Sequence, residues 1–110
     1  MLIVNSDSSI ELTRGDTARL AVNLEQEDGR DYEMQPGDVL TLSLKKSVKD
    51  TAIVMQKVIT GGNVFYIQPE DTAKLEFAKY KYDVQLTTEA GEVYTVITPA
   101  VFKITAEVTT

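Results

Sequence analysis

The sequence predicts an all-β domain, an immunoglobulin-like antiparallel sandwich of about seven to nine strands. Three observations predict this fold. Apolar and polar residues alternate along most of the chain, turn residues interrupt the alternation at short intervals, and no long stretch has helical spacing of its apolar residues. The 110 residues match the size of one domain, so we expect a single sandwich spanning residues 1–110.

The first half of the chain contains four segments that alternate as strands do. We expect these strands at residues 9–12, 18–24, 40–44 and 52–59. Asp28-Gly29 follows the second as a tight turn, and Pro36-Gly37-Asp38 precedes the third. Because the apolar members of each strand share one face, they define a half-buried sheet.

The second half repeats the pattern around a break. Gly61-Gly62-Asn63 closes a hairpin onto a strand at residues 64–68, and a short helical turn follows near residues 70–75, led by Pro69. Further strands are expected at residues 80–86, 93–97 and 102–108. Pro99 is expected to separate the last two, because proline cannot donate to a sheet ladder.

The segment Asp71-Thr72-Ala73, followed by Tyr80 and Tyr82, predicts a tyrosine corner. In immunoglobulin-type sandwiches such a tyrosine donates its hydroxyl to upstream backbone at the entry to a late strand. We expect Leu75 to fill the core and one of the two tyrosines to form the corner. An aromatic binding patch is the alternative for the pair.

The composition excludes several kinds of chemistry. The chain has no histidine and no cysteine, so Ser-His-Asp triads, Cys-His dyads and histidine or cysteine metal sites are impossible. We therefore expect no enzyme, no catalytic residues, no metal and no cofactor. The net charge of −6 argues against a nucleic-acid partner. The densest basic stretch, Lys45, Lys46 and Lys49, is best interpreted as a solvated strand end.

The densest acidic cluster surrounds the Asp28-Gly29 turn and consists of Glu25, Glu27, Asp28, Asp31 and Glu33. We interpret it as solvated loop charge. Two alternatives are a pair of catalytic carboxylates and a loose calcium site, although the spacing does not match an EF-hand loop.

Arg14-Gly15-Asp16 spells a tripeptide that integrins recognise. The chain has no apparent signal peptide, and Gly15 and Asp16 suit a turn between the first two strands, so we interpret the motif as a turn. No segment approaches the roughly 20 apolar residues of a membrane span, so no membrane contact is expected.

The terminal strands are candidate edges for pairing with a partner. Met1–Val4 and Phe102–Val108 are both strand-like. The run Leu2-Ile3-Val4 is apolar at every position, so it either pairs with another subunit or lies along its own sheet, the latter being favoured.

Several motifs occur in an order that resembles a known family. They are Leu12-Thr13-Arg14-Gly15-Asp16-Thr17, Gly37-Asp38, Pro69-Glu70-Asp71-Thr72 with Leu75 and Tyr80, Tyr82-Asp83-Val84-Gln85-Leu86, and the run from Gly91 to Pro99. This order resembles structural proteins of phages and prophages of Gram-positive bacteria, in particular the N-terminal domain of baseplate upper proteins. The resemblance implies an immunoglobulin-like sandwich that docks on other virion proteins and carries no catalytic residues.

We therefore expect a structural or assembly protein of a virion tail or baseplate, made in the bacterial host cytoplasm. Other virion proteins would be its partners, and a homo-oligomer is also compatible. A carbohydrate-binding sandwich is the alternative, with Tyr32, Tyr66 or Tyr94 stacking on sugar rings. A carboxylate enzyme is the third hypothesis, and it would need two acidic side chains converging in a pocket.

Overall fold

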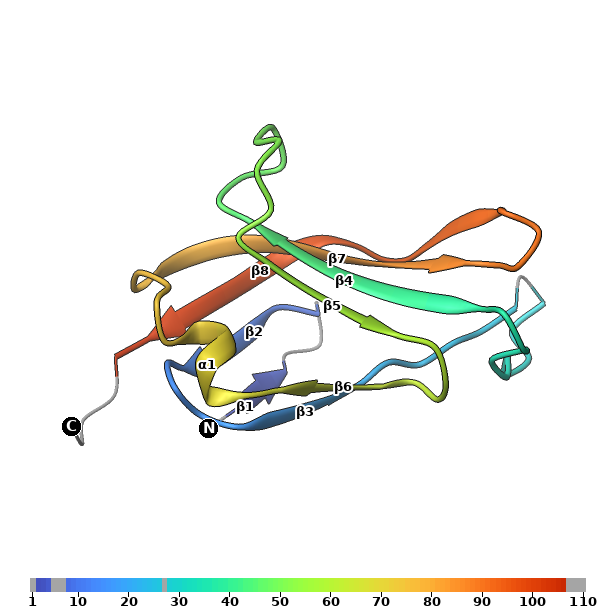
Figure 1. Ribbon diagram of the computed structural model, residues 1–110, viewed down its shortest axis with the longest axis horizontal. Coiled ribbons are helices and arrows are strands. Elements are labelled where there is room, and N and C mark those ends of the chain that lie inside the picture. The colour runs from blue at the N-terminus through green and yellow to red at the C-terminus, as the bar shows by residue number, and fades with distance from the viewer. Residues whose placement is uncertain (1, 5–7, 27, 107–110) are drawn as a thin grey trace.

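The protein folds as an all-β sandwich in which a large curled sheet covers a small one (Figure 1). The computed structural model describes residues 2–4, 8–26 and 28–106. In chain order its elements are β1 (Leu2–Val4), β2 (Ile10–Thr13), β3 (Ala18–Ala21), β4 (Val39–Lys45), β5 (Met55–Ile59), β6 (Val64–Ile67), α1 (Pro69–Thr72), β7 (Ala78–Thr87) and β8 (Val93–Thr105). The predicted fold class is thus confirmed.

The larger sheet has the strand order β1-β2-β8-β7-β4-β5, and the smaller pairs β3 with β6. The molecule is elongated, with principal extents of 44 × 26 × 24 Å. One end holds α1, and the other holds the loop of residues 25–38 and the β7–β8 hairpin of residues 88–92 (Figure 1). We refer to these as the α1 end and the acidic end.

The hydrophobic core is formed by the inward-facing side chains of the strands, which alternate with outward-facing ones. In β4, Leu40, Leu42 and Leu44 are fully buried, while the residues between them are half-buried. A buried leucine contributes roughly 1.5–3 kcal/mol relative to an exposed one, so a one-residue register shift would be strongly unfavourable. Both sheets supply the core, whose members are Ile10, Leu12, Ala18, Leu20, Val22, Leu24, Leu40, Leu42, Leu44, Met55, Phe65, Ile67, Tyr80, Tyr82, Val84, Leu86, Phe102 and Ile104.

The α1 end contains the predicted tyrosine corner. The Tyr80 hydroxyl donates to the Glu76 carbonyl at 2.9 Å, and the buried Tyr82 donates its hydroxyl to the carbonyl of Ser8. Thr72 is buried and accepts the Gly15 amide at 2.9 Å, and Leu75 packs partly buried against the core. Tyr80 is therefore the corner residue, and α1 spans residues 69–72 rather than 70–75.

The expected break at Pro99 is wrong, because residues 93–105 form the single strand β8. The β7–β8 register shifts on either side of Val84, whose neighbours Tyr82 and Gln85 pair with Ala100 and Thr95. These shifts are bulges that place extra residues on β8. Proline is tolerated at bulges and on strand edges, because the ladder there does not require its amide.

The remaining differences concern pairing and strand limits. β2 and β8 pair in parallel, so the sandwich is not wholly antiparallel. This pairing joins segments distant in sequence, whereas a hairpin imposes antiparallel pairing only on consecutive strands. Some strands start later or end earlier than expected: β3 ends at Ala21, β5 begins at Met55, β6 ends at Ile67 and β8 ends at Thr105. Residues 107 and 108 of the expected last strand lie outside the described residues.

Candidate functional site

The candidate site begins with an unpaired backbone edge on β8. This strand pairs with β7 along almost its whole length, whereas β2 covers its other side only from Phe102 to Thr105. Along residues 93–101 that side of β8 has no strand beside it among the described residues. β3 likewise pairs with β6 alone, so its outer side is also an edge in the described chain.

These two edges border one groove with a volume of about 1160 Å³. Residues 20–26 with Asp28 and Tyr32 form one wall, and residues 94–97 with Leu86 and Thr88 form the other. Tyr82 and Ser8 line it as well. Because Ser8 lies just before β2, the groove continues the path of that strand towards the acidic end.

The groove is lined largely by the margin of the hydrophobic core. Leu20, Val22, Leu24 and Leu86 belong to the core and also line the groove. Val96 and Ile97 are half-buried and pack against that core from the β8 side. The groove therefore runs along the margin of the core, where these four core residues are buried and the half-buried Val96 and Ile97 are partly accessible to a ligand.

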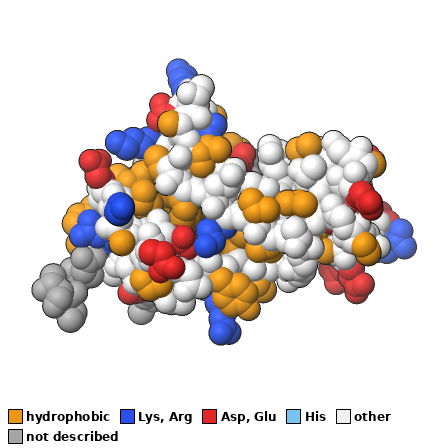
Figure 2. Space-filling model, in the orientation of Figure 1, with side chains coloured by type: hydrophobic (Ala, Val, Ile, Leu, Met, Phe, Trp, Pro, Cys, Tyr) orange, Lys and Arg blue, Asp and Glu red, His pale blue; other side chains and the backbone are white. Residues whose placement is uncertain are grey.

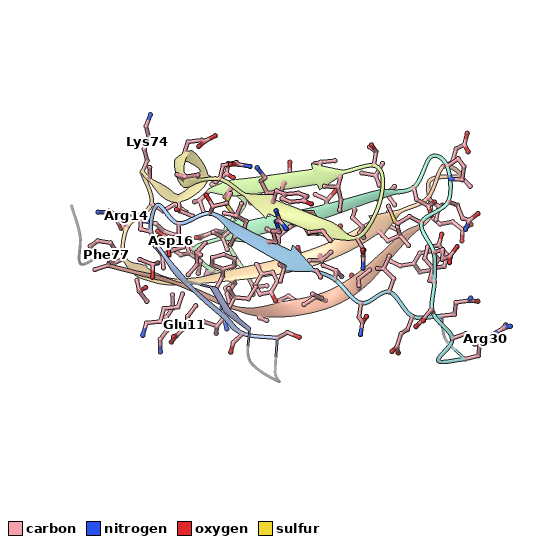
Figure 3. The ribbon with its side chains drawn as sticks, turned by 90° about the horizontal axis from the view of Figure 1, so that it is seen from below. Glu11, Arg14, Asp16, Arg30, Lys74 and Phe77 are labelled. Atoms are coloured by element: carbon pink, nitrogen blue, oxygen red, sulfur yellow. The ribbon has the colours of Figure 1, made fainter. Side chains whose placement is uncertain are left out.

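The end of the molecule beyond the groove is acidic. Among the described residues, six exposed carboxylates lie on its loops, namely Glu25, Asp28, Asp31, Glu33, Glu89 and Glu92. Arg30 is the single basic residue in the described part of residues 25–38 and 88–92, and its Nε lies 2.7 Å from Asp28 Oδ2. Figure 3 places Arg30 at this end and Arg14 and Lys74 at the other. This end therefore has an excess of negative charge, which concentrates negative potential beside the groove.

A buried hydrogen-bonded group supports this end of the groove. The Tyr32 hydroxyl donates to Asp38 Oδ2, and the same oxygen accepts the Gln35 amide at 2.9 Å. The hydrogen bond to Asp38, together with burial and the nearby negative charge of that carboxylate, raises the pKa of Tyr32 above its ordinary value. Asp38 is itself buried, so the Pro36-Gly37-Asp38 turn serves the fold.

The three tyrosines considered for sugar stacking are not brought together. Tyr32 and Tyr94 both line the groove, and the Tyr94 hydroxyl donates to the Glu92 carboxylate. Tyr66 lies on β6, exposed, with the Arg19 guanidinium carbon 5.5 Å from its ring centroid. A sugar site could therefore use two of the predicted residues.

The predicted acidic cluster divides between the groove and the solvent. Glu25 and Asp28 line the groove, Glu25 forms an isolated β-bridge with Asp31, Glu33 is exposed, and Glu27 lies outside the described residues. Among the described acidic residues, no three lie close enough to hold a metal ion. The two groove carboxylates are exposed, so they present charge to a ligand instead of a shielded acid–base pair.

The Arg14-Gly15-Asp16 motif is a turn between β2 and β3, as predicted. Gly15 has φ +83°, and the Asp16 amide donates to the Thr13 carbonyl at 3.1 Å. The Arg14 guanidinium carbon lies 4.1 Å from the centroid of the Phe77 ring, and Figure 3 shows the two side chains together. Arg14 thus helps to hold the α1 end.

The other predicted surfaces fall elsewhere. β1 pairs with β2, so Leu2–Val4 lies along its own sheet as favoured. Phe102–Ile104 is paired on both sides, so the expected free edge there is wrong, and the free edge lies in the earlier part of β8 among the described residues. Lys46 and Lys49 are exposed and Lys45 is half-buried at the end of β4, beside the protruding loop seen at the top of Figure 1.

No protein-family model, curated protein or solved structure matches this chain. Among the described residues, no helix is long and apolar enough to cross a membrane. The function is therefore argued from the groove and its surroundings.

Proposed function

We propose that this chain is a non-catalytic structural or assembly protein of a phage or prophage virion, acting in the tail or baseplate through protein–protein contacts. The observation that supports the docking role is the groove beside residues 94–97, where a strand edge with no partner strand among the described residues borders the margin of the core. Such edges are used for strand addition between proteins. The virion setting comes from the resemblance of the motif order to baseplate upper proteins.

A catalytic role has less support than docking. With no histidine or cysteine, acid–base chemistry would have to come from carboxylates, lysines or tyrosines. The carboxylates lining the groove are exposed, and Asp28 is paired with Arg30. The chemical features gathered at the groove, apolar surface and unpaired backbone, are those of a binding site.

Immunogold labelling of purified particles tests the virion assignment. We expect an antibody against this chain to label tails or baseplates of particles from a strain that encodes it. Purified chain added to the antibody should abolish the labelling. If the antigen is intact in the preparation and no particle is labelled, the virion assignment is wrong.

A carbohydrate-binding module is the second candidate, because Tyr32 and Tyr94 both line the groove. Aromatic rings stack on sugar faces, and the groove carboxylates could accept sugar hydroxyls. A glycan array should then show binding that Tyr94→Ala reduces. Binding no higher than background on the array would eliminate this candidate.

A further inference from the structure

We infer that the groove receives an extended segment of a partner protein, which adds a strand to β8 at residues 93–98 and places lysine or arginine residues over the acidic end. This inference rests on the proposed docking function and specifies the chemistry of the partner. It follows from three properties of the groove: its backbone edge, its apolar lining and the charge beside it.

The backbone edge requires an extended ligand. Every second residue of an edge strand directs its N–H and C=O groups outwards, and only another extended chain satisfies them in series. The side of β8 away from β7 has this property along residues 93–101, for the described part of the chain. Because the groove continues the path of β2, the added segment would extend the larger sheet along a line that β2 leaves open.

The lining requires apolar residues at alternate positions of the segment. Successive side chains of a strand point to opposite faces, so every second one would face Leu20, Val22 and Leu24. A six-residue strand spans roughly 20 Å, so a segment matching residues 93–98 would present about three side chains to the core. Their burial would cover the margin of the core along this side of the sandwich.

The charge selects a basic segment. In the described part of the acidic end, six carboxylates are exposed and Arg30 is the single basic residue, already paired with Asp28. A segment with lysine or arginine beyond its apolar part would meet complementary charge, whereas an acidic one would be repelled. The N-terminal segment of a second copy does not fit, because residues 1–10 contain Asp7 and no lysine or arginine.

Three synthetic peptides test the inference with the full chain. The probe is the amidated peptide Lys-Val-Thr-Val-Thr-Val-Lys-Lys. One control replaces every lysine by glutamate, and the other replaces both threonines by proline, which removes backbone donors but keeps the charge. Titration monitored by NMR gives the affinity, and amide hydrogen exchange locates the site.

We expect the probe to slow exchange at alternate amides of residues 93–98, and both controls to bind at least tenfold more weakly. Added salt should lower the affinity of the probe peptide, because it screens the charges. The variant Glu25→Lys/Asp31→Lys should bind the probe peptide with roughly tenfold lower affinity, since two exposed charge pairs are reversed. The matched control Asp50→Lys/Glu70→Lys makes the same charge change outside the acidic end and should bind the probe normally.

The inference is overturned if the probe does not bind, if protection appears outside residues 93–98, or if the acidic peptide binds equally well. It is also overturned if a glycan, and no peptide, protects these amides. These results are separate from the virion assignment. Particles that are labelled normally while no peptide enters the groove would leave the proposed function standing and refute the inference.

Discussion

The two parts of β8 show how one strand can be interior at one end of a protein and an edge at the other. At residues 102–104 it lies between β2 and β7, and Phe102 and Ile104 are buried. At residues 93–97 only β7 lies beside it among the described strands, and Val93 and Tyr94 are half exposed. The difference shows that sandwich closure depends on which segment reaches the second side of a strand, because both parts of β8 belong to one continuous strand that pairs with β7.

The surroundings of the two parts differ in the same direction. Near the α1 end, Tyr82 contacts the Phe102 ring edge-on with centroids 5.7 Å apart, and Tyr80 and Tyr82 are both hydrogen-bonded to backbone. Near the acidic end, the space beside β8 is the groove. In Figure 2 most of the visible basic side chains lie away from the acidic end, whereas acidic side chains are visible along the whole length of the molecule. Packing therefore stabilises one end, and the other is available for binding.

The largest expected contrast is in core truncation. Phe102→Ala should reduce the free energy of unfolding by about 3–5 kcal/mol, because it leaves a cavity in a fully packed site. Val96→Ala, in the open part of β8, should reduce it by less than about 1 kcal/mol, since this side chain is already half-exposed. Urea denaturation followed by circular dichroism measures both. Equal losses would refute the distinction between the two parts.

Two glycines of the acidic end should respond unequally to alanine. Both have positive φ, but a Cβ on Gly37 would lie 2.6 Å from the Glu89 Cβ, whereas a Cβ on Gly29 would meet nothing within 4 Å. We expect Gly37→Ala to cost about 2–4 kcal/mol, from the backbone and the clash together. Gly29→Ala should cost about 1–2 kcal/mol from the backbone alone. Thermal unfolding of the two variants compares them, and a larger loss for Gly29→Ala would contradict the described contact.

Removing one tyrosine hydroxyl at each end provides a finer comparison. Tyr80→Phe should cost about 1–2 kcal/mol, because it leaves a part-buried carbonyl of Glu76 without this donor. Tyr94→Phe should cost less than about 0.5 kcal/mol, because its bond to Glu92 is exposed. Denaturant midpoints at constant m-value compare the two losses in free energy of unfolding. An unchanged midpoint for Tyr80→Phe would show that the corner hydrogen bond contributes little to stability.

The smallest expected effect is a pH dependence at the α1 end. Burial alone would raise the pKa of Asp71, but hydrogen bonds from Lys57 and the Gln68 amide outweigh it and hold the pKa below its ordinary 3.8. Because the folded pKa is depressed, its contribution to stability is present above pH 3.8 and is lost as the pH falls through the folded value. Asp71→Asn should therefore destabilise by about 1 kcal/mol at neutral pH and less in acid.

Denaturation of Asp71→Asn and the parent chain at a series of pH values measures this. Glu70→Gln, on the exposed neighbour, serves as the control and should leave the pH profile unchanged. A difference between Asp71→Asn and the parent that persists undiminished at the lowest pH would mean that the Lys57 ion pair is not its source.

Sequence predictions that depend on residues close together in the chain were confirmed, whereas features that depend on contacts between distant segments were missed. The alternation of Leu40, Leu42 and Leu44 predicted a buried face, and the order of Asp71, Thr72 and the later tyrosines predicted the corner; both are confirmed. The groove was not predicted, although Tyr32 and Tyr94 had been considered as binding residues. The missed signal is Pro99: interpreting it as a break divided β8, and the unequal lengths of β8 and β2 were lost with it.

The amino-acid sequence by itself determined the strands, most of their turns and the residues that form the core, because these depend on side-chain polarity and on backbone preferences between near neighbours. The absence of histidine and cysteine chemistry was equally a property of the sequence. Only the tertiary structure decided that β2 begins at Ile10 and pairs in parallel with β8, and that residues 94–97 border a groove. Strand pairing is made by backbone groups common to all residues, so the choice of partner and the extent of pairing depend on how distant segments pack.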